Sequence, residues 1–356
     1  MEETIIKATD LENLVTSIFK AHQIPEEHAV IIAQGLVSAD LRGVFSHGVV
    51  RVPMYCERLR HELVNRQPEM QVTRTSPASR LIDGDNGMGF VVGKVAMDEA
   101  IVLAEEMGIS LIGVHNSGHF GMSAFYLQQA LDAGMISFVY TNSSPAMPVW
   151  GGRTRFLGAS PFAAAAPGGE YGDFVLDMAC TVTARGKLKY AAQRGESIAP
   201  GLALDSEGKP TTDGNKAFDG VVLPFGGVKG AALSMLMEIL CGVFTGANFA
   251  GEVKNPHTDL SGPQNVGHFF MAIKPDLFMS EGRFKERMDT LCSRAKNSDK
   301  AEGFDEIFIP GEIEANTEAE RRKNGIPLTP DVIQSLKQEA EKAGITEQSH
   351  LTSALW

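Results

Sequence analysis

Cysteine and tryptophan are scarce in this chain, with four and two residues respectively among 356. The cysteines lie far apart and form no CxxC pair, so we expect free thiols and neither a disulfide framework nor a zinc knuckle. Basic residues are also in deficit, because 32 Lys and Arg face 44 Asp and Glu and leave a net charge of −12. Nucleic acids and anionic membranes bind basic patches, so we expect neither as a partner.

Long apolar runs are missing as well. The longest, Ala231–Val243, is interrupted by Glu238 and is too short to cross a bilayer. The first ten residues, MEETIIKATD, are acidic and contain no apolar signal segment. We therefore expect a cytoplasmic protein, and 356 residues favour about two domains.

Three familiar ligand motifs are absent, namely the P-loop, the G-x-S-x-G nucleophile elbow and a strict G-x-G-x-x-G. The nearest approach to the last is Gly87–Gly93, which is one residue too long. This segment opens a predicted helix, so it is either an anion-binding helix start or a glycine-rich turn.

What is present is an alternation of short β-prone runs and helical patterns, which predicts a layered α/β or α+β protein. We expect strands at 70–74, 80–83, 109–114, 136–141, 162–166, 173–178, 269–273 and 307–310. We expect helices within 8–43, where Pro25 opens the second of two, and at 50–63, 91–107, 122–133, 229–246, 280–297 and 330–343. Residues 184–196 are expected to be helical or irregular.

Two histidines lie in segments whose residue types suit a catalytic site. His47 follows Ser46, and Arg51 and Tyr55 would share its face if the segment were helical, although Gly48 and Pro53 weaken that premise. An arginine binds a carboxylate and a histidine exchanges a proton with a neighbouring carbonyl or hydroxyl. The alternative is a surface helix capped by Ser46.

His119 lies in the glycine-flanked segment Asn116–Gly121, after a predicted strand, where layered α/β proteins collect ligands. His115 is four residues away, but the intervening Asn-Ser-Gly opposes a helix, so we expect no metal site. Small residues around Ser143 and Ser160 offer close approach to a planar ring or a phosphate, or else form ordinary turns, and Lys229 at a helix start suits a phosphate. Asp177 orients a histidine, holds a ribose hydroxyl, or is a cap or turn residue.

Taken in order, these segments resemble the malate/L-lactate/L-sulfolactate dehydrogenase family, the NAD(P)-dependent 2-hydroxy-acid dehydrogenases without a Rossmann fold. The family includes ureidoglycolate dehydrogenase, diketogulonate reductase and the piperideine/pyrroline-2-carboxylate reductases. Besides Arg51 and Tyr55, the matching segments are Ala39–Gly43, Ser46–Gly48, Asn116–Gly121, Asn142–Pro145, Trp150–Gly152, Gly158–Pro167, Asp177–Ala179, Gly186–Lys187, Lys229–Gly230 and Phe308–Glu312.

The resemblance implies a helical domain made from both termini (1–70 with 281–356) and an inserted nucleotide- and substrate-binding α/β domain (71–280) with a largely antiparallel mixed sheet. It also implies a homodimer. By the family pattern His47 is the acid/base with Ser46 as a relay, and His119 is the second candidate. Arg51, Tyr55 and Ser143 match substrate contacts. The cofactor, NAD in preference to NADP, is expected to contact Ser160, Asp177, Met178, Ala179, Lys229, Gly230, Gly311 and Glu312.

The chain departs from the family pattern at Gly158-Ala159-Ser160-Pro161, where many members have Gly-Thr-Asn-Pro. The lost amide puts transfer of ureidoglycolate specificity in doubt. We expect hydride transfer between NAD(P)H and C2 of a small 2-oxo or 2-hydroxy acid, with reduction of a cyclic imino acid as the alternative. A cofactor-free histidine-dependent hydrolase or lyase, and a noncatalytic dimeric binding protein, are the rivals from other classes.

Overall fold

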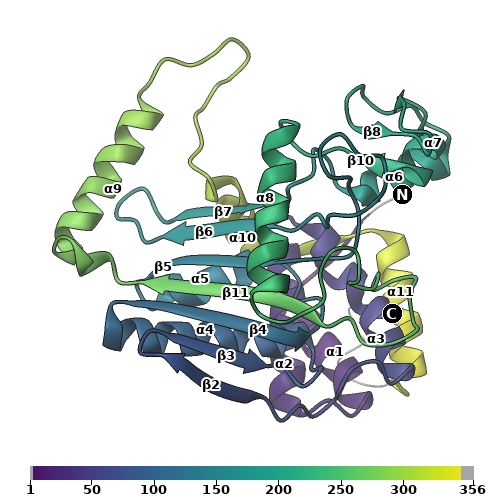
Figure 1. Cartoon of the computed structure of the whole chain (residues 1–356), viewed down its shortest axis with the longest axis horizontal. Helices are drawn as coiled ribbons and strands as arrows, with labels where there is room; N and C mark the ends of the chain where they lie inside the picture. Colours follow the sequence, from purple (N-terminus) through teal and green to yellow (C-terminus); the bar gives the residue numbers. More distant parts are fainter. Residues whose placement is uncertain (1–2, 346–356) are drawn as a thin grey trace.

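The computed structural model describes residues 3–345 and is built around a seven-stranded sheet (Figure 1). The strand order is β2-β3-β4-β11-β5-β6-β7, and every neighbouring pair is antiparallel except β3 and β4. The strands span Gln71–Ser76 (β2), Ser79–Asp83 (β3), Ile109–Ser117 (β4), Ile136–Thr141 (β5), Phe162–Ala166 (β6), Phe174–Met178 (β7) and Val266–Ile273 (β11). The prediction of a largely antiparallel mixed sheet is confirmed.

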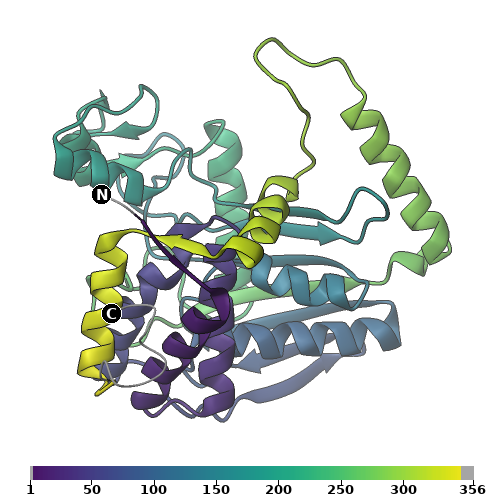
Figure 2. The same cartoon turned by 180° about the vertical axis from the view of Figure 1, so that it is seen from behind.

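Helices cover both faces of this sheet. Helices α4 (Gly89–Met107) and α5 (Ala124–Asp132) lie on one face, and α8 (Val228–Glu238) lies on the other (Figures 1 and 2). A π-helical segment, η3 (Ile239–Val243), continues α8. Alanines at helical spacing along α4 let the helix approach the sheet closely, and Gly108 in the left-handed conformation ends it. This packing makes the sheet a rigid platform for the segments at its ends.

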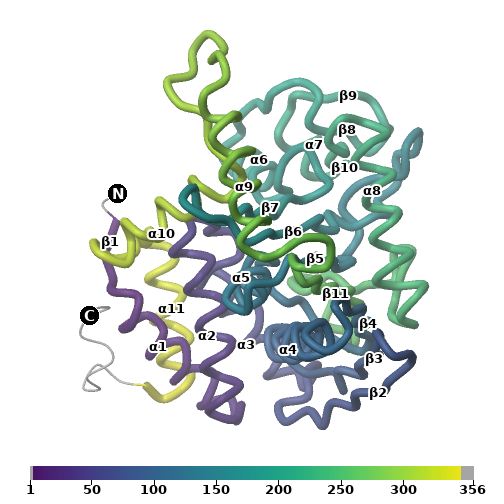
Figure 3. The backbone as a smooth tube through the Cα atoms, turned by 90° about the vertical axis from the view of Figure 1, so that its left-hand side faces the viewer, coloured from purple at the N-terminus to yellow at the C-terminus, as the bar shows by residue number. Residues whose placement is uncertain are grey.

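The two ends of the chain build one helical bundle beside the sheet (Figure 3). It contains α1 (Ala8–Ala21), α2 (Glu26–Leu41), α3 (Val52–Arg60) and α11 (Pro330–Lys342). Strand β1 (Thr4–Ile6) pairs with β12 (Ile326–Leu328) and joins the two termini directly. A helical part built from both termini is confirmed, and the boundaries at 70 and 280 stay predictions, with 346–356 outside the described residues.

Two segments lie apart from these layers. Helix α9 (Glu281–Lys296) projects beyond the far end of the sheet in Figure 1. A small subdomain between β7 and α8 holds α6 (Arg185–Arg194), α7 (Gly214–Asp219) and the three-stranded sheet of β8 (Ala203–Leu204), β9 (Pro210–Thr211) and β10 (Val221–Val222). Among residues 3–345, no helix is both long and apolar enough to cross a bilayer.

The predicted strand at 307–310 is wrong. Its observed backbone link is a single hydrogen bond from the amide of Val175 to the carbonyl of Pro310, 3.0 Å long, and no ladder follows. The next residues form α10 (Glu312–Asn324), a helix that the sequence analysis did not predict. None of its side chains is fully buried, so the sequence has no apolar stripe from which this helix could be predicted.

Candidate active site

The predicted site residues gather at one end of the sheet. His119 follows β4, Ser143 follows β5, Ser160 precedes β6 and Asp177 lies near the end of β7. Strands β4 and β5 are both antiparallel to β11, and β6 is antiparallel to β5 and β7, so these four positions share one edge. Ligands of layered α/β proteins commonly bind at such an edge.

His119 is fixed there by contacts to both parts of the chain. The Tyr55 hydroxyl of α3 lies 2.6 Å from His119 Nδ1, and the Gly121 amide donates to the same nitrogen at 3.3 Å. The His119 amide donates to Gln264 Oε1 at 3.3 Å. Because a backbone amide can only donate, Nδ1 is an acceptor, which assigns the ring proton to Nε2.

The glycine-rich segment 87–93 serves this anchoring. Gly89 begins α4, and a Cβ at this position would collide with the backbone of Gly118 and His119. The backbone here therefore packs on the histidine segment, which gives the glycine a structural role.

A second histidine, fully buried, stands beneath this segment. His268 of β11 links two neighbouring strands, with Nδ1 2.8 Å from Thr141 Oγ1 and Nε2 2.8 Å from Ser117 Oγ. Its ring stacks on Phe120 with centroids 4.6 Å apart. Burial lowers the pKa of His268 to about 3, so this ring is neutral and is a structural link.

His47 comes to the same place from the helical bundle. Its ring stacks on that of His119, with centroids 5.8 Å apart and an angle of 14°. Ser46 Oγ lies 3.0 Å from His47 Nδ1, where a relay was expected. The continuous helix predicted for 50–63 is only partly right, because two 3₁₀ turns, Phe45–His47 and Val49–Arg51, precede α3.

A buried carboxyl group shapes the His47 turn. Asp40, only 2% exposed, accepts a 2.7 Å hydrogen bond from the Val49 amide. A Cβ at Gly48 would overlap this carboxyl group, so the turn packs on Asp40 only as glycine. Arg321 of α10 donates to the Asp40 carbonyl and stacks on Phe45, 4.5 Å from the ring centre. Helix α10 and Asp40 thus hold the turn that carries His47.

Arg51 lies beside the histidine pair. Its Nε donates to the Ser46 carbonyl at 2.6 Å, and its Nη1 contacts Nε2 of His257 very closely. Among residues 3–345, Nη2 of Arg51 has no hydrogen-bond partner, so part of the guanidinium is available to a ligand. A guanidinium of this kind binds carboxylates.

The arrangement keeps the histidines neutral. Burial, and then the charge of Arg51, lowers the pKa of His47 to about 4. The pKa of His119 is lowered well below its ordinary value by burial first, with Arg51 and His47 adding to the effect. At neutral pH the site therefore carries one cation, Arg51, beside two uncharged imidazoles.

The segments predicted to hold a cofactor also meet. Ser160 donates from its amide toward Ser143 Oγ at 3.4 Å, and Cys180 donates from its amide to the Ala159 carbonyl at 2.7 Å. The backbone of Gly230 lies against the Cys180 carbonyl so closely that a Cβ would come within 2.7 Å. This brings 143, 160, 178–180 and 229–230 together.

One buried hydroxyl in this cluster lacks a partner. Ser160 is fully buried at φ +31°, and among residues 3–345 its Oγ makes no hydrogen bond. Buried polar groups are seldom left unpaired, so the orphaned hydroxyl fits a site that a polar ligand completes.

Two predicted cofactor residues have protein partners. Asp177 Oδ2 accepts a 2.8 Å hydrogen bond from the Ala124 amide at the start of α5, which is the capping role that the sequence left open. Glu312 pairs with Lys296 at 2.6 Å. Gly311, at φ +94°, lies against Val175 at the edge of β7.

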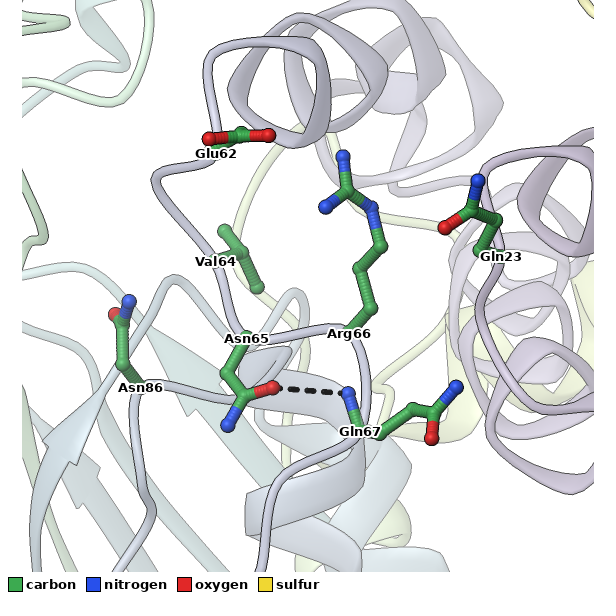
Figure 4. Close-up of a pocket in the computed structure, with 7 residues that line it drawn as sticks. All are labelled: Gln23, Glu62, Val64, Asn65, Arg66, Gln67 and Asn86. Atoms are coloured by element: carbon green, nitrogen blue, oxygen red, sulfur yellow. Dashed lines mark hydrogen bonds between the residues drawn. The ribbon is translucent and has the colours of Figure 1, made fainter.

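Two other features do not belong to this site. A hollow of about 460 Å³ lies near the α3–β2 connection, and the close-up in Figure 4 draws its lining residues, none of them a predicted site residue. His22, Cys56 and Glu339 place side-chain ligand atoms within 4.8 Å of one another. Glu339 already binds Arg60 at 2.7 Å and Lys342 at 2.8 Å, and these cations oppose a metal ion.

Sequence reasoning missed His257 and Gln264. Both lie in the irregular connection before β11, whose residues carry no periodic pattern and no ligand motif. Their relevance follows from contacts with Arg51 and His119, which are 206 and 145 residues away in the chain.

The chain matches the malate/L-lactate dehydrogenase family model over residues 6–337, and it belongs to this family. It is 39% identical to L-sulfolactate dehydrogenase of Methanocaldococcus jannaschii over 98% of this chain and 99% of that protein. It is 38% identical to malate dehydrogenase of Pyrococcus abyssi, over 96% of this chain and 95% of that one.

Solved structures agree with this assignment. The structure of sulfolactate dehydrogenase from M. jannaschii superposes with a TM-score of 0.90 at 39% identity, over 96% of this chain and 98% of that one. Δ1-piperideine-2-carboxylate reductase from Pseudomonas syringae pvar. tomato superposes with a TM-score of 0.83 at 26% identity, over 94% and 99%.

Proposed function

We propose that this protein is an NAD(P)-dependent dehydrogenase that interconverts a small 2-hydroxy acid and its 2-oxo acid. The observation that carries the proposal is the stacked pair of His47 and His119 beside Arg51. It supplies two proton-transfer groups and one carboxylate-binding group within a single site. The names of the relatives, sulfolactate and malate dehydrogenase, support the same reaction class.

Arg51 binds the substrate carboxylate and fixes the orientation of the neighbouring C2. A nicotinamide cofactor, if held by the segments assigned below, would supply or accept the hydride at C2. In the reducing direction His47 donates the proton to the carbonyl oxygen, with Ser46 beside its Nδ1, and His119 is the second candidate.

The neutral resting state of the histidines has a consequence for this mechanism. Arg51 lowers the pKa of His47 and His119, and a bound carboxylate offsets the charge of Arg51. Substrate binding therefore raises both pKa values and loads a proton where the reaction uses it.

We assign the cofactor to the segments that meet around Ser160 and to the neighbouring strand β7 with Gly311 at its edge. The residues that would hold it are Ser160, Asp177, Met178, Ala179, Lys229, Gly230, Gly311 and Glu312, with Ser143 between cofactor and substrate. The orphaned Ser160 hydroxyl supports this assignment. Names of relatives include both NAD(+) and NADP(+), and we favour NAD.

A second candidate is reduction of a cyclic imino acid, favoured by the structural similarity to piperideine-2-carboxylate reductase. The same arginine would bind the carboxylate of the imino acid, and the same histidine would exchange a proton with its nitrogen in place of a carbonyl oxygen.

We further propose a homodimer in the cytoplasm. The outer side of α8 and η3 exposes an apolar stripe that includes Leu236, Ile239, Val243 and Phe244, the last 71% exposed. Contiguous apolar surface of this kind marks interfaces. Sedimentation of the purified chain at several concentrations tests this, and a monomer throughout contradicts it.

The plain test of the activity is a panel of 2-oxo acids and cyclic imines with NADH and NADPH, followed by absorbance of the reduced nicotinamide. Turnover of a 2-oxo acid supports the first proposal, and turnover of imines alone supports the second. If neither cofactor binds and no compound is reduced, both proposals are wrong. The result would then favour a cofactor-free hydrolase or lyase, or a noncatalytic binding protein.

A further inference from the structure

One face of α3 meets the candidate active site along its length. Arg51, at the N-cap of the helix, and Tyr55 and Arg58 within it are spaced by four and three residues, so their side chains lie on the same face. Arg51 contacts His257, and Tyr55 contacts His119. Arg58 is the next side chain on this face, and it meets a neighbouring part of the same region.

Arg58 binds the backbone of the irregular connection before β11. Its Nη1 donates to the Asp259 carbonyl and its Nη2 to the Gly262 carbonyl, each at 3.1 Å. Arg58 is only 2% exposed, and among residues 3–345 it forms no ion pair with a carboxylate. A buried cation without a counter-ion is costly, and this one directs its hydrogen bonds to two carbonyls of a single segment. Its position therefore indicates that it fixes this segment.

Residues 254–264, which we name the 254–264 loop, contain no helix and no strand. Gln264 donates to the Lys254 carbonyl at 2.9 Å and accepts from the His119 amide at 3.3 Å. Among residues 3–345, the hydrogen bonds that join the loop to the helical bundle come only from Arg51 and Arg58. The loop therefore depends on Arg58 for its position against α3.

His257 carries the position of this loop to Arg51. The guanidinium can only donate, so Nε2 of His257 accepts and the ring is neutral with its proton on Nδ1. Burial, and then the charge of Arg51, lowers the pKa of His257 to about 4, so the ring stays uncharged at neutral pH. The Ser46 carbonyl and His257 thus hold Nε and Nη1 of the guanidinium and leave Nη2 for a ligand. A displaced loop would change the direction in which Nη2 points.

We propose that Arg58 is a positioning residue for substrate binding. It fixes the 254–264 loop, the loop places His257 against Arg51, and Arg51 presents Nη2 to the substrate carboxylate. This role rests on the proposed function, because it takes Arg51 as the partner of that carboxylate. Arg58 itself does not contact the reacting atoms, so its loss should change substrate affinity more than the chemical step.

Substitutions at both ends of this chain of contacts test the role in the full-length protein, with NADH and the best 2-oxo acid of the panel. Arg58→Met removes both hydrogen bonds to the loop, Arg58→Lys keeps the charge and one donor group, and His257→Gln removes the imidazole. Arg66→Met is the matched control, because Arg66 also donates to a backbone carbonyl, that of Leu59 at 2.7 Å, and does not contact the loop.

KM for the 2-oxo acid is the diagnostic quantity. It should rise about fivefold or more in Arg58→Met and in His257→Gln, rise less in Arg58→Lys, and stay within about twofold of wild type in the control, with kcat changed less than KM. Because both residues act through one loop, the double variant should be only about as impaired as the worse single variant. An unchanged KM in Arg58→Met, an equal rise in Arg66→Met, or effects that multiply in the double variant would overturn the role. If Arg58→Met does not fold, Arg58→Lys carries the same comparisons.

Hydrogen exchange of the free protein separates failure of this role from failure of the proposed function, because it needs neither substrate nor cofactor. The amides of residues 254–264 should exchange faster in Arg58→Met and at the wild-type rate in Arg66→Met. Unchanged exchange in Arg58→Met overturns the role whether or not the protein turns over a 2-oxo acid. A wild-type protein that reduces no compound overturns the proposed function, and faster exchange in Arg58→Met would then still support the anchoring of the loop.

Discussion

Tyr55→Phe tests how the helical bundle controls the histidine pair. It deletes the hydroxyl that lies 2.6 Å from His119 Nδ1 and keeps the ring that packs edge-on against Phe90, 5.5 Å away. The Gly121 amide still donates to Nδ1 at 3.3 Å, so this nitrogen is not left unsatisfied. The loss is then that of one net hydrogen bond, about 1–1.5 kcal/mol. If His119 must hold its orientation in the transition state, kcat/KM falls about 5- to 12-fold.

The assay is steady-state reduction of the best 2-oxo acid of the panel, with Tyr140→Phe as control. Tyr140 is also a largely buried tyrosine, and it lies in β5 with its ring beside Phe269. The control should keep kcat/KM within about twofold, because no hydrogen bond to a histidine is lost. Wild-type values of both kcat and KM in Tyr55→Phe would refute the positioning role.

Three further predictions follow from buried groups. Gly48→Ala brings a Cβ onto Asp40, so it should lower kcat/KM by about tenfold or more through displacement of the His47 turn, whereas Gly282→Ala, with open space around it, should not. Burial raises the pKa of Asp40 from 3.8 to about 7, so the free energy of unfolding of the wild type should fall by about 4 kcal/mol as the pH rises from 4 to 8. In Asp40→Asn, measured by urea unfolding, this pH-dependent fall should be about 4 kcal/mol smaller. The pKa of His268 is lowered from 6.5 to about 3, so the neutral ring stabilises the fold fully above pH 6.5, and the free energy of unfolding should fall by about 5 kcal/mol as the pH drops to 3. In His268→Gln the free energy of unfolding should decrease less steeply in acid, and an unchanged decrease would contradict this.

The sheet could be predicted because its strands carry their own local signal. Ile136–Thr141 and Phe162–Ala166 begin and end at the predicted residues. The strands β8 to β10 are only two residues long, too short for any alternation to register. Helix α10 has no buried apolar face, and its contacts with the His47 turn come from charged side chains such as Arg321.

The site was most readily predictable where motif residues lie at the ends of strands. His119 and Ser160 lie at strand ends, and the sequence places them there. The tight packing of Gly48 on Asp40 joins residues 8 positions apart in the sequence, and the stacking of His47 on His119 joins residues 72 positions apart. His257 offered no local signal, because it lies in an irregular loop. Its role follows only from the neighbours that the fold gives it.

The central claim is that His47 and Arg51 act on a 2-oxo acid in a nicotinamide-dependent reaction. The most direct measurement is single-turnover oxidation of bound reduced nicotinamide by the best substrate, in wild type and in His47→Ala. The account predicts turnover by wild type and a rate lowered by ~10²–10⁴-fold in the variant, with cofactor affinity retained. An unchanged rate in His47→Ala would contradict the assignment, and the same experiment on His119→Ala would then show whether that histidine transfers the proton.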